Sequence, residues 1–383
     1  MKKLCFVTAS PLTLRAFMRN HMLHLSKHYD VTAVADFSDE NLSADYFPCV
    51  RLKAIHIVRQ IDLRADLIAL ALLFRFFKIE NFDVVHSVTP KAGLLAMTAS
   101  RLAGVQHRIH CFTGQVWATR TGFGRALLKN TDRVIAANAN HILTDSISQR
   151  KFLELEQIVR AGRSEVLNAG SISGVDIENF CPNEDIRLRV RIEWGIPQKA
   201  CLLLFIGRLN RDKGILDLAN VFSKLAHNNK EIWLVVVGRD EADIGNEFDR
   251  LCGDGFHHVR RIEHVANPAH AMAAADILVL PSYREGFPVV VIEAAACGIP
   301  AVASQIYGVT DAVEDKITGL LHLPGNLASL GDCLQKLCTD SKLRLKMGRA
   351  ARERVEAKFS MESVTAALVA YYENILGSSI MEK

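Results

Sequence analysis

The segment at residues 207–214, GRLNRDKG, places cations beside glycines directly after an apolar run at 201–206. Glycine lets the chain turn sharply at the end of a strand. Arg208 and Lys213 would then stand at the carboxyl edge of a sheet, where a phosphate can bind. An arginine holds phosphate through two parallel hydrogen bonds, and a lysine adds a point charge. The alternative is an ordinary solvated loop between a strand and a helix.

A second segment, PSYREGFP at 281–288, leads into an apolar helix predicted at 289–297. Pro288 suits the first position of a helix, and the N–H groups that follow can bind an anion. Glu285 lies just outside this helix, whereas Glu293 lies inside it between VVVI and AAAC. A carboxylate in apolar surroundings needs a partner. That partner is either a hydroxyl-rich ligand such as ribose, or a core arginine or backbone N–H.

Two features of the first half have both a functional and a structural interpretation. His110 lies near the end of the predicted strand at 108–112 and would face the ligand-binding cleft. The alternative is a structural histidine of the sheet. The stretch at 59–78 has an apolar face with cations at its edges, namely Arg59, Arg64, Arg75 and Lys78. This pattern is typical of a helix on a membrane surface, and equally of a crossover helix packed on a sheet.

Several common catalytic motifs are missing from the sequence. It contains no GxxxxGK[ST] and no GxGxxG after the first strand, which argues against a P-loop enzyme and a dinucleotide-dependent dehydrogenase. It also lacks HExxH, GxSxG and Asp-x-Asp. Because Mg²⁺ prefers oxygen ligands, the missing carboxylate pair weighs against a divalent-metal site. We therefore expect neither a metal nor another cofactor.

The elements that must position these residues alternate between short apolar runs and amphipathic segments, which predicts parallel sheets joined by helices. The predicted strands are 4–9, 31–35, 84–88, 108–112, 141–144 and 165–167, then 201–206, 232–237, 259–262, 277–280 and 301–303. The predicted helices include 63–79, 92–103, 147–161, 215–226, 268–275, 289–297, 327–338 and 360–375. Two such series indicate an α/β fold of two Rossmann-like, doubly wound domains that face each other across a cleft.

Length and charge agree with this division. The chain has 383 residues, enough for two or three domains. We predict an N-terminal domain at 1–178, a C-terminal domain at 179–360, and a helix at 361–383 that packs back on the N-terminal domain. Residues 1–180 carry 22 Lys/Arg against 16 Asp/Glu. Such mild basicity suits an anionic substrate or lipid surface and is too weak to indicate nucleic acid.

The cysteines and the apolar stretches indicate where in the cell the protein acts. None of the nine cysteines forms a CxxC pair, which fits a reducing cytosol. No apolar stretch has the length needed to span a bilayer. We therefore expect a cytoplasmic protein, at most peripheral on the inner face of the cytoplasmic membrane.

The second half of the chain resembles the donor domain of retaining, metal-independent glycosyltransferases with the GT-B fold, the large family usually numbered four. GRLNRDKG resembles the phosphate-binding segment of that family, and EGFPVVVIE at 285–293 matches its Glu-x7-Glu motif. VVVGRDEAD at 235–243 is also similar. The likeness spans roughly residues 1–377 and is looser in the first half. There, DVVHSVTPKAGLLAM resembles bacterial enzymes that build surface polysaccharides such as lipopolysaccharide on lipid carriers.

The resemblance implies a role for each residue singled out above. The implied catalytic residues are Glu285, which would contact the donor sugar, and His110. In the implied donor site, the diphosphate would be held by Arg208, Lys213 and the backbone N–H groups near Phe287, Val289 and Val290. The ribose would be held by Glu293. The base would lie near Gly238, Arg239 and Ile262. The family often has a Gly-Gly pair after its first strand, whereas this chain has ASPLTLR there. Thr13 and Arg15 are the acceptor-side candidates in this segment.

The function that the resemblance implies is retaining transfer of a hexose or N-acetylhexosamine. The donor would be a nucleoside-diphosphate sugar, with UDP expected, and the acceptor a polyprenyl-diphosphate-linked sugar. The expected partners are thus the nucleotide-sugar, the lipid-linked acceptor and an anionic membrane, without nucleic acid. Two alternatives stay open: a sugar-nucleotide epimerase of GT-B shape, and a non-catalytic sugar-nucleotide-binding subunit.

Overall fold

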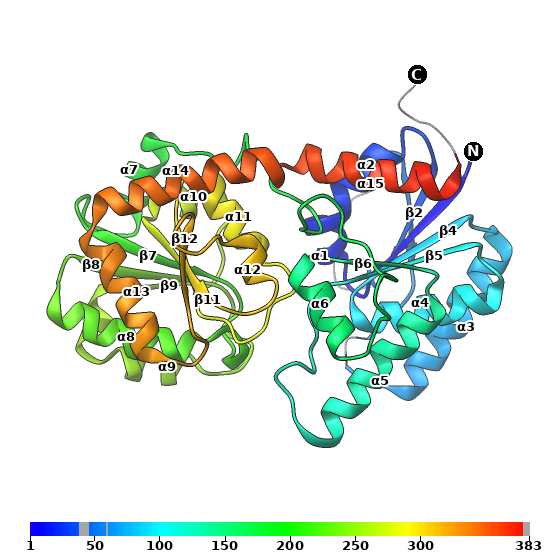
Figure 1. The fold of residues 1–383 in the computed structure, drawn as a ribbon, viewed down its shortest axis with the longest axis horizontal. Coiled ribbons are helices and arrows are strands. Elements are labelled where there is room, and N and C mark those ends of the chain that lie inside the picture. Colours follow the sequence, from blue (N-terminus) through cyan, green and yellow to red (C-terminus); the bar gives the residue numbers. More distant parts are fainter. Residues whose placement is uncertain (38–45, 59, 378–383) are drawn as a thin grey trace. The chain divides into compact units, whose positions relative to one another are not determined.

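The computed structural model describes residues 1–37, 46–58 and 60–377. The chain divides into two compact units (Figure 1). The first unit combines Met1–Ser173 with the C-terminal segment that begins at Met361, and the second unit is Gly174–Ser360. The chain thus enters the second unit after Ser173 rather than after residue 178, and it returns to the first unit after Ser360.

Six parallel strands form the sheet of the first unit, in the order β3-β2-β1-β4-β5-β6. The strands are β1 (Lys3–Val7), β2 (Asp30–Ala35), β3 (Val50–Ala54), β4 (Val84–Val88), β5 (His107–Phe112) and β6 (His141–Thr144). The helical elements are α1 (Pro11–Thr13), η1 (Leu14–Met18), α2 (Arg19–Leu25), α3 (Leu63–Glu80), α4 (Pro90–Ala103), α5 (Gly122–Asn138), α6 (Ile147–Leu155) and α15 (Met361–Leu376). One face of the sheet packs against α3, α4 and α5, and the other against η1, α2 and α15.

Local sequence signals set the ends of these helices. Asp62 accepts two backbone N–H groups at the start of α3, both at 3.0 Å, and Asn81 ends that helix with a φ of 55°. Pro90 opens α4, and Gly104 closes it with a φ of 79°. The predicted crossover helices therefore begin and end close to the expected residues.

The C-terminal helix α15 belongs to the first unit. The Tyr372 hydroxyl lies 2.8 Å from Nδ1 of His86 on β4, and the Thr365 hydroxyl lies 3.0 Å from Nδ1 of His21 on α2. Figure 1 draws α15 in red beside α2. These buried hydrogen bonds fix the helix on the sheet although it lies far away in sequence.

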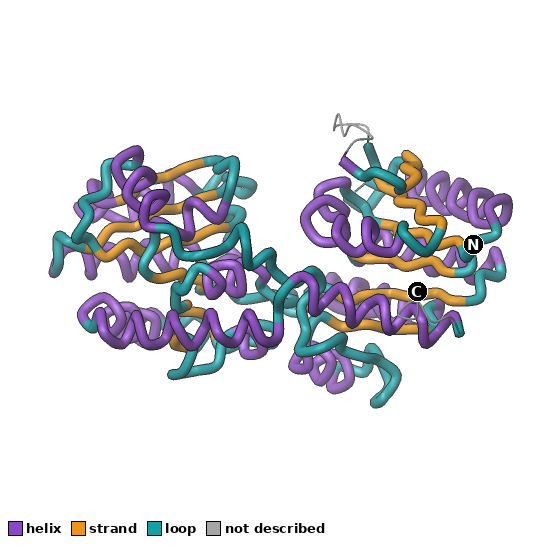
Figure 2. Tube along the Cα trace, turned by 90° about the horizontal axis from the view of Figure 1, so that it is seen from above, coloured by secondary structure: helices purple, strands orange, loops and turns teal. Residues whose placement is uncertain are grey.

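The second unit repeats the architecture, with a parallel sheet in the order β12-β11-β10-β7-β8-β9. Its strands are β7 (Cys201–Ile206), β8 (Ile232–Val237), β9 (Val259–Ile262), β10 (Ile277–Leu280), β11 (Ala301–Ser304) and β12 (Gly319–His322). Its α-helices are α7 (Glu184–Glu193), α8 (Ile215–Asn228), α9 (Gly245–Cys252), α10 (Pro268–Ala274), α11 (Val289–Ala296), α12 (Val309–Ala312), α13 (Leu327–Thr339) and α14 (Ser341–Lys358). In Figure 2, helices flank the strands of each unit.

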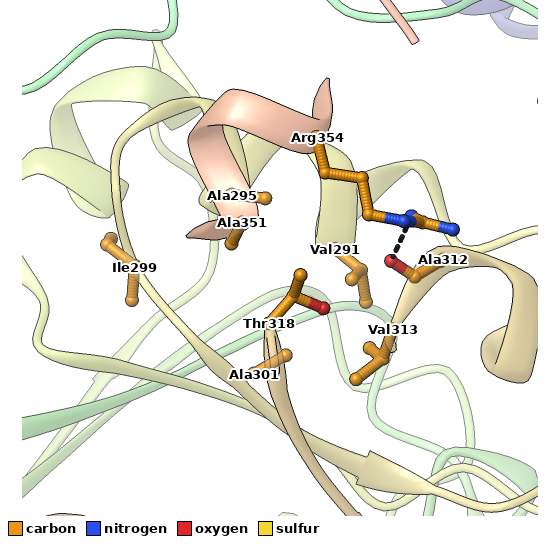
Figure 3. A pocket seen from close by; sticks show the side chains of 9 residues that line it. All are labelled: Val291, Ala295, Ile299, Ala301, Ala312, Val313, Thr318, Ala351 and Arg354. Atoms are coloured by element: carbon orange, nitrogen blue, oxygen red, sulfur yellow. Dashed lines mark hydrogen bonds between the residues drawn. The ribbon is translucent and has the colours of Figure 1, made fainter. Parts of the chain in front are cut away.

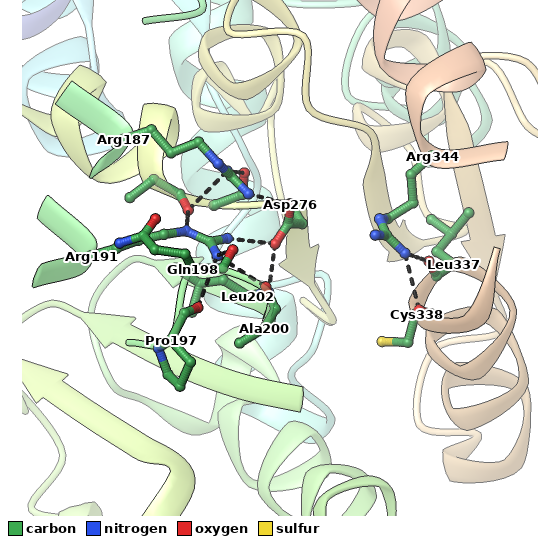
Figure 4. A network of polar contacts seen from close by, with 12 residues as sticks. Arg187, Arg191, Pro197, Gln198, Ala200, Leu202, Asp276, Leu337, Cys338 and Arg344 are labelled. Carbon is green, nitrogen blue, oxygen red and sulfur yellow. Dashed lines mark hydrogen bonds and ion pairs between the residues drawn. The ribbon is translucent and has the colours of Figure 1, made fainter. Parts of the chain in front are cut away.

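A buried arginine ties α7 to the amino ends of β7 and β10 (Figure 4). Arg191 on α7 is fully buried and donates to the Ala200 carbonyl at 3.0 Å and to Oδ2 of Asp276 at 2.6 Å. Asp276 also accepts the Leu202 N–H at 2.7 Å and a bond from Arg187 at 2.7 Å. Since a buried charge is tolerated only when it is fully paired, this network holds two neighbouring strands in register.

The structure contains the predicted strands with one exception. At 165–167 there is no strand, because Glu165 forms only an isolated bridge with Leu143. Two edge strands were not expected from the sequence, β3 and β12. The first reads VRLKA and is largely exposed, and the second is only GLLH. Edge strands are short or charged, so the apolar pattern that reveals central strands is weak in them.

Candidate active site

The strand order of the second unit creates a switch point between β7 and β10. β7 pairs with β8 on one side and with β10 on the other, so the chain leaves these two strands in opposite directions. In open α/β sheets, ligands bind outside the carboxyl ends of the strands at this point. The loop at 207–214 follows β7 and the loop at 281–288 follows β10, and these are the two motif segments of the sequence.

Two ion pairs join these loops. Nζ of Lys213 lies 2.6 Å from Oε1 of Glu285, and Nη2 of Arg284 lies 2.9 Å from Oδ2 of Asp212. The Tyr283 N–H also donates to the Asp212 carbonyl at 2.8 Å. The structure therefore brings together Lys213, which is predicted to bind the diphosphate, and Glu285, which is predicted to be catalytic. Asp212 and Arg284 were not predicted, and their only signal in the sequence is opposite charge beside Lys213 and Glu285.

The two loops also meet through the backbone. Gly214 has a φ of +66°, and a Cβ placed there would lie 2.0 Å from the Pro281 carbonyl oxygen. Only glycine allows both the left-handed conformation and the close approach. Oδ1 of Asn210 accepts the Lys213 N–H at 3.1 Å and shapes the turn before Gly214. The local sequence therefore fixes the position from which the Lys213 side chain extends.

The residues predicted to hold the base lie at the neighbouring ends of β8 and β9. The Gly238 N–H donates to the Ile262 carbonyl at 2.9 Å. A Cβ on Gly238 would lie 1.9 Å from the Gly207 carbonyl oxygen. Arg239 instead extends into solvent, where its Nε lies 3.5 Å from Oε1 of the equally exposed Glu263. The backbone around Gly238 is thus the better-defined part of this predicted subsite.

Arg208 does not point at Lys213 in this structure. Its Nη1 lies 2.7 Å from Oε2 of Glu241, and the two side chains are 43% and 39% exposed. An exposed ion pair of this kind contributes only about 0–1 kcal/mol. A phosphate could therefore displace Glu241 at small cost.

The helix α11 begins at Val289, as the sequence indicated. Pro288 is the cap residue before the helix rather than its first residue, so the position predicted for Pro288 is corrected. The N–H groups of Val289 and Val290 then belong to the first turn, where no intrahelical acceptor exists. The Phe287 side chain is buried against Phe359, with ring centroids 5.4 Å apart. The amino end of α11 thus adjoins Glu285 and carries a partial positive charge.

Glu293 lies on α11 and has no partner for its carboxylate among the residues that the structure describes. Burial raises the pKa of this carboxyl from 4.5 to about 7. The core arginine or backbone N–H that could have satisfied it is thus not found in the described part of the chain. An unpartnered, half-buried carboxylate at this place fits a ligand that supplies hydroxyl donors.

The first unit buries His110 in its sheet. The side chain is 1% exposed, and its Nδ1 lies 2.8 Å from the Ser87 hydroxyl. A Cβ on Gly93 of α4 would lie 2.3 Å from the His110 ring, so the ring is pressed against that helix. Burial lowers the His110 pKa to about 3. His110 is therefore a neutral, buried residue of β5, and its catalytic role stays a prediction.

The switch point of the first sheet lies between β1 and β4. Thr13 and Arg15 follow β1 on α1 and η1, with Thr13 half-buried and Arg15 exposed. Thr89 follows β4 with a φ of 76°, and its buried hydroxyl has no partner among the described residues. Thr89 was not predicted; the Thr-Pro step that starts α4 is its signal in the sequence. Thr13, Arg15 and Thr89 are therefore the polar candidates on this edge.

A small cavity behind α11 is not a ligand site. It measures about 10 Å³, which is no more than a water molecule needs. Figure 3 shows Val291 and Thr318 lining it, with Arg354 reaching across to donate to the Ala312 carbonyl at 3.1 Å. Elsewhere in the described residues, no three His, Cys, Asp or Glu side chains are arranged to hold a metal ion.

Two family models match consecutive parts of the sequence. The model described as "Glycosyl transferases group 1" matches residues 187–354, which lie within the second unit. The model described as "Glycosyl transferase 4-like domain" matches residues 21–170, within the first unit. Both predicted motif segments of the second unit fall inside the first of these matches.

Individual proteins are similar along nearly the whole chain. The capsular polysaccharide biosynthesis glycosyltransferase CapM of Staphylococcus aureus is 28% identical over 85% of this chain and 85% of its own length. The UDP-Gal:alpha-D-GlcNAc-diphosphoundecaprenol alpha-1,3-galactosyltransferase of Escherichia coli is 24% identical over 86% and 83%. The structure of Anabaena HepE with UDP and glucose matches with a TM-score of 0.81 and 18% identity, covering 98% of this chain and 100% of that one. The predicted GT-B fold class is confirmed.

Proposed function

Since the chain belongs to the group 1 glycosyl transferases, a retaining, metal-independent family that uses nucleotide-sugar donors, we propose that it transfers a hexose or N-acetylhexosamine from a UDP-sugar to a polyprenyl-diphosphate-linked sugar. The main observation that supports binding of the nucleotide-sugar donor is the Lys213–Glu285 ion pair at the switch point of the second sheet. It places a cation and a carboxylate next to the amino end of α11.

The donor would lie along the carboxyl edge of the second sheet. Its diphosphate would sit between the Lys213 ammonium and the free N–H groups of Val289 and Val290, where the helix dipole favours an anion. Arg208 would leave Glu241 and add a second cation. The ribose hydroxyls would donate to the Glu293 carboxylate, which has no protein partner in the described residues.

The residues nearest to the diphosphate supply the electrostatic part of the reaction. The bond between the anomeric carbon and the diphosphate oxygen breaks, and negative charge accumulates on the leaving group. The Lys213 ammonium and the α11 dipole would stabilise that charge in a preorganised site. Glu285, held 2.6 Å from Lys213, would orient the ammonium and the sugar. The leaving phosphate would take the acceptor proton on the same face, so the anomeric configuration is retained.

The names of similar proteins support the choice of substrates. HepE was solved with UDP and glucose, and the Escherichia coli relative is named for UDP-Gal and a diphosphoundecaprenol-linked sugar. The mildly basic first half of this chain suits such an anionic acceptor. A place in polysaccharide assembly agrees with the name of CapM.

Helix α3 supports contact with an anionic membrane. Its exposed large apolar residues are Leu63, Leu67, Ile68, Leu72, Phe74 and Ile79, and its exposed cations are Arg64, Arg75 and Lys78. Asp66 and Glu80 are engaged with Lys91 and Arg51 at 2.7 and 2.8 Å, so the exposed side carries net positive charge. Arg59 lies outside the described residues. In the part of the chain that the structure describes, no helix could cross a membrane, so this contact would be peripheral.

A transfer assay tests the proposal. Radiolabelled UDP-sugars are incubated with the protein, EDTA and a synthetic polyprenyl-diphosphate sugar, and label in the lipid product is measured. We expect Lys213→Ala to lower the rate by roughly 10²–10³, as when a preorganised charge stabiliser is removed. Lys224→Ala is the matched control, because this exposed lysine lies on α8 of the same unit. Full activity of Lys213→Ala would overturn the assignment of this residue.

The same assay separates the two alternatives. Isomerised sugar released without an acceptor would identify an epimerase. Donor binding without any product, even in the presence of membranes, would identify a non-catalytic binding subunit. Transfer to a water-soluble sugar alone would keep the glycosyltransferase and reject the lipid-linked acceptor.

A further inference from the structure

A groove of about 240 Å³ lies on the first unit, on the side of β6 that no predicted site residue occupies. It is formed by the end of α5, by β6 and by the segment that follows α6. Three arginines line it, Arg133, Arg160 and Arg163. Its floor is apolar and includes Ile142, Ile158 and Val159, all of which are buried.

The three guanidinium groups are not neutralised by carboxylates. Arg133 donates only to neutral oxygens, the Gln157 carbonyl at 3.2 Å and Oδ1 of Asn130 at 2.8 Å. Arg160 and Arg163 are exposed, and within the described residues neither forms an ion pair.

Two acidic side chains beside the groove are engaged by other groups. Glu156, on the same segment, binds Arg125 at 2.8 Å and Lys129 at 2.6 Å. Oε1 of Glu154 accepts the Gly162 N–H at 3.3 Å. The groove therefore keeps a local excess of positive charge.

The lowered pKa of the neighbouring His141 agrees with an excess of positive charge around the groove. His141 is the first residue of β6, and its pKa is lowered by burial and by the nearby His107, Arg108 and Arg163. Burial and nearby charges of the same sign both raise the cost of adding a positive charge to the imidazole. The surroundings of the groove thus favour an anion over a further cation.

The groove is separate from the edge where the acceptor-side candidates lie. α5 ends at Asn138 and β6 begins at His141, so the groove borders the amino end of this strand. Thr13, Arg15 and Thr89 lie instead beyond the carboxyl ends of β1 and β4. A ligand in the groove would leave that edge free.

From this combination we infer that the groove is a second anion site, which binds a ligand that carries a phosphate group on an apolar body. Guanidinium groups bind phosphate oxygens in pairs, and the apolar floor would take the carbon part. Exposed Leu127 and Val134 lie on α5, the helix that contributes Arg133 to the groove, and exposed Leu155 ends α6 just before the segment that contributes Arg160 and Arg163. Apolar residues exposed on these elements, together with the apolar floor, favour the phosphate of a lipid headgroup over a free phosphate. The inference does not depend on the proposed reaction.

The test compares two triple variants that remove the same charge. Arg133→Gln/Arg160→Gln/Arg163→Gln empties the groove of cations, and Arg189→Gln/Arg250→Gln/Arg349→Gln removes three exposed arginines of the second unit. Binding is measured by flotation with phosphatidylglycerol and phosphatidylcholine vesicles at low salt, and by thermal shift with inorganic phosphate. Both variants keep α3, so any contact that this helix makes is the same in both.

We expect the groove variant to lose on the order of a hundredfold in affinity for phosphatidylglycerol vesicles, about fivefold per arginine near an anionic surface. The control variant should lose far less. If instead only the stabilisation by inorganic phosphate is lost, the site holds and its ligand is a soluble phosphate. If neither probe distinguishes the two variants, the inference is wrong. The groove variant should unfold at the same Tm as the control variant, which shows that it is folded. UDP should stabilise both variants alike, which separates this test from the proposed function.

Discussion

The carboxylate of Glu293 should destabilise the fold whenever it is ionised. Burial raises its pKa from 4.5 to about 7, and no described residue donates a hydrogen bond to it. Replacing it in Glu293→Gln keeps the shape of the side chain and removes the charge. We therefore expect a variant that is more stable than the wild type at alkaline pH and yet binds the donor less tightly.

The pKa shift sets the size and sign of this effect. Because the folded state holds the proton more tightly than the unfolded state, the stability from the protonated carboxyl is fully present below pH 4.5 and is lost as the pH rises through about 7. Raising the pKa of this carboxyl from 4.5 to about 7 corresponds to about 3 kcal/mol in the free energy of unfolding. Glu293→Gln should thus be about 3 kcal/mol more stable than the wild type at pH 8, and less than about 1 kcal/mol more stable at pH 5.

Thermal unfolding of the ligand-free protein at pH 5 and pH 8 checks this. For a unit of this size, about 3 kcal/mol corresponds to a rise in Tm of roughly 6–12 °C at pH 8. Glu231→Gln is the matched control, an exposed glutamate of the same unit, and should show no such gap. In the presence of UDP, Glu293→Gln should bind roughly 10–100-fold more weakly, the value of a charged hydrogen bond. A variant whose Tm equals that of the wild type at both pH values would refute the reasoning.

Three further predictions follow from the loops and from α3. Gly214→Ala should lower Tm by several degrees, since a left-handed alanine costs about 1–2 kcal/mol before its clash with the loop at 281–288 is counted; an unchanged Tm would contradict this. Asp212→Asn and Arg284→Gln should each lower kcat by roughly ten- to a hundredfold by displacing Lys213 and Glu285. The charge-swapped Asp212→Arg/Arg284→Asp should recover part of the loss. If kcat is equally low in both single variants and in the charge-swapped variant, the ion pair has no positioning role. Leu67→Ser/Leu72→Ser should weaken flotation with phosphatidylglycerol vesicles while UDP binding stays normal, and equal flotation would show that α3 does not touch the membrane.

The central strands of both sheets were predictable from the sequence because they are buried on both faces. β7 reads CLLLFI and β8 reads IWLVVV, and few structures other than a buried parallel strand accommodate such runs. β3 reads VRLKA at a sheet edge, where solvent satisfies the charged residues. Glu165 and its neighbours had the composition of a strand, but they form only one bridge. Whether these segments form strands depends on the strands available for pairing and not on the strand propensity of their residues.

The sequence predicted which loops form the site, but it did not predict which side chains contact one another there. Glycine and charge after a strand located both loops at the switch point of the second sheet. The sequence did not reveal that Arg208 binds Glu241, or that Arg284 binds Asp212, because residues distant in sequence choose their partners through the tertiary fold. The burial of His110 against α4 was not predictable for a related reason. The short run 108–112 does not show which strand residue faces α4, and Gly93, which leaves room for the ring, lies on another element.

Calorimetric titration of UDP into the protein in the presence of EDTA tests the central claim most directly. We predict that UDP binds, that Lys213→Ala weakens the binding roughly 10–100-fold through the loss of a charged hydrogen bond, and that Lys224→Ala binds UDP like the wild type. If UDP does not bind, or if Lys213→Ala binds it as tightly as Lys224→Ala does, the switch point of the second sheet does not hold the donor diphosphate.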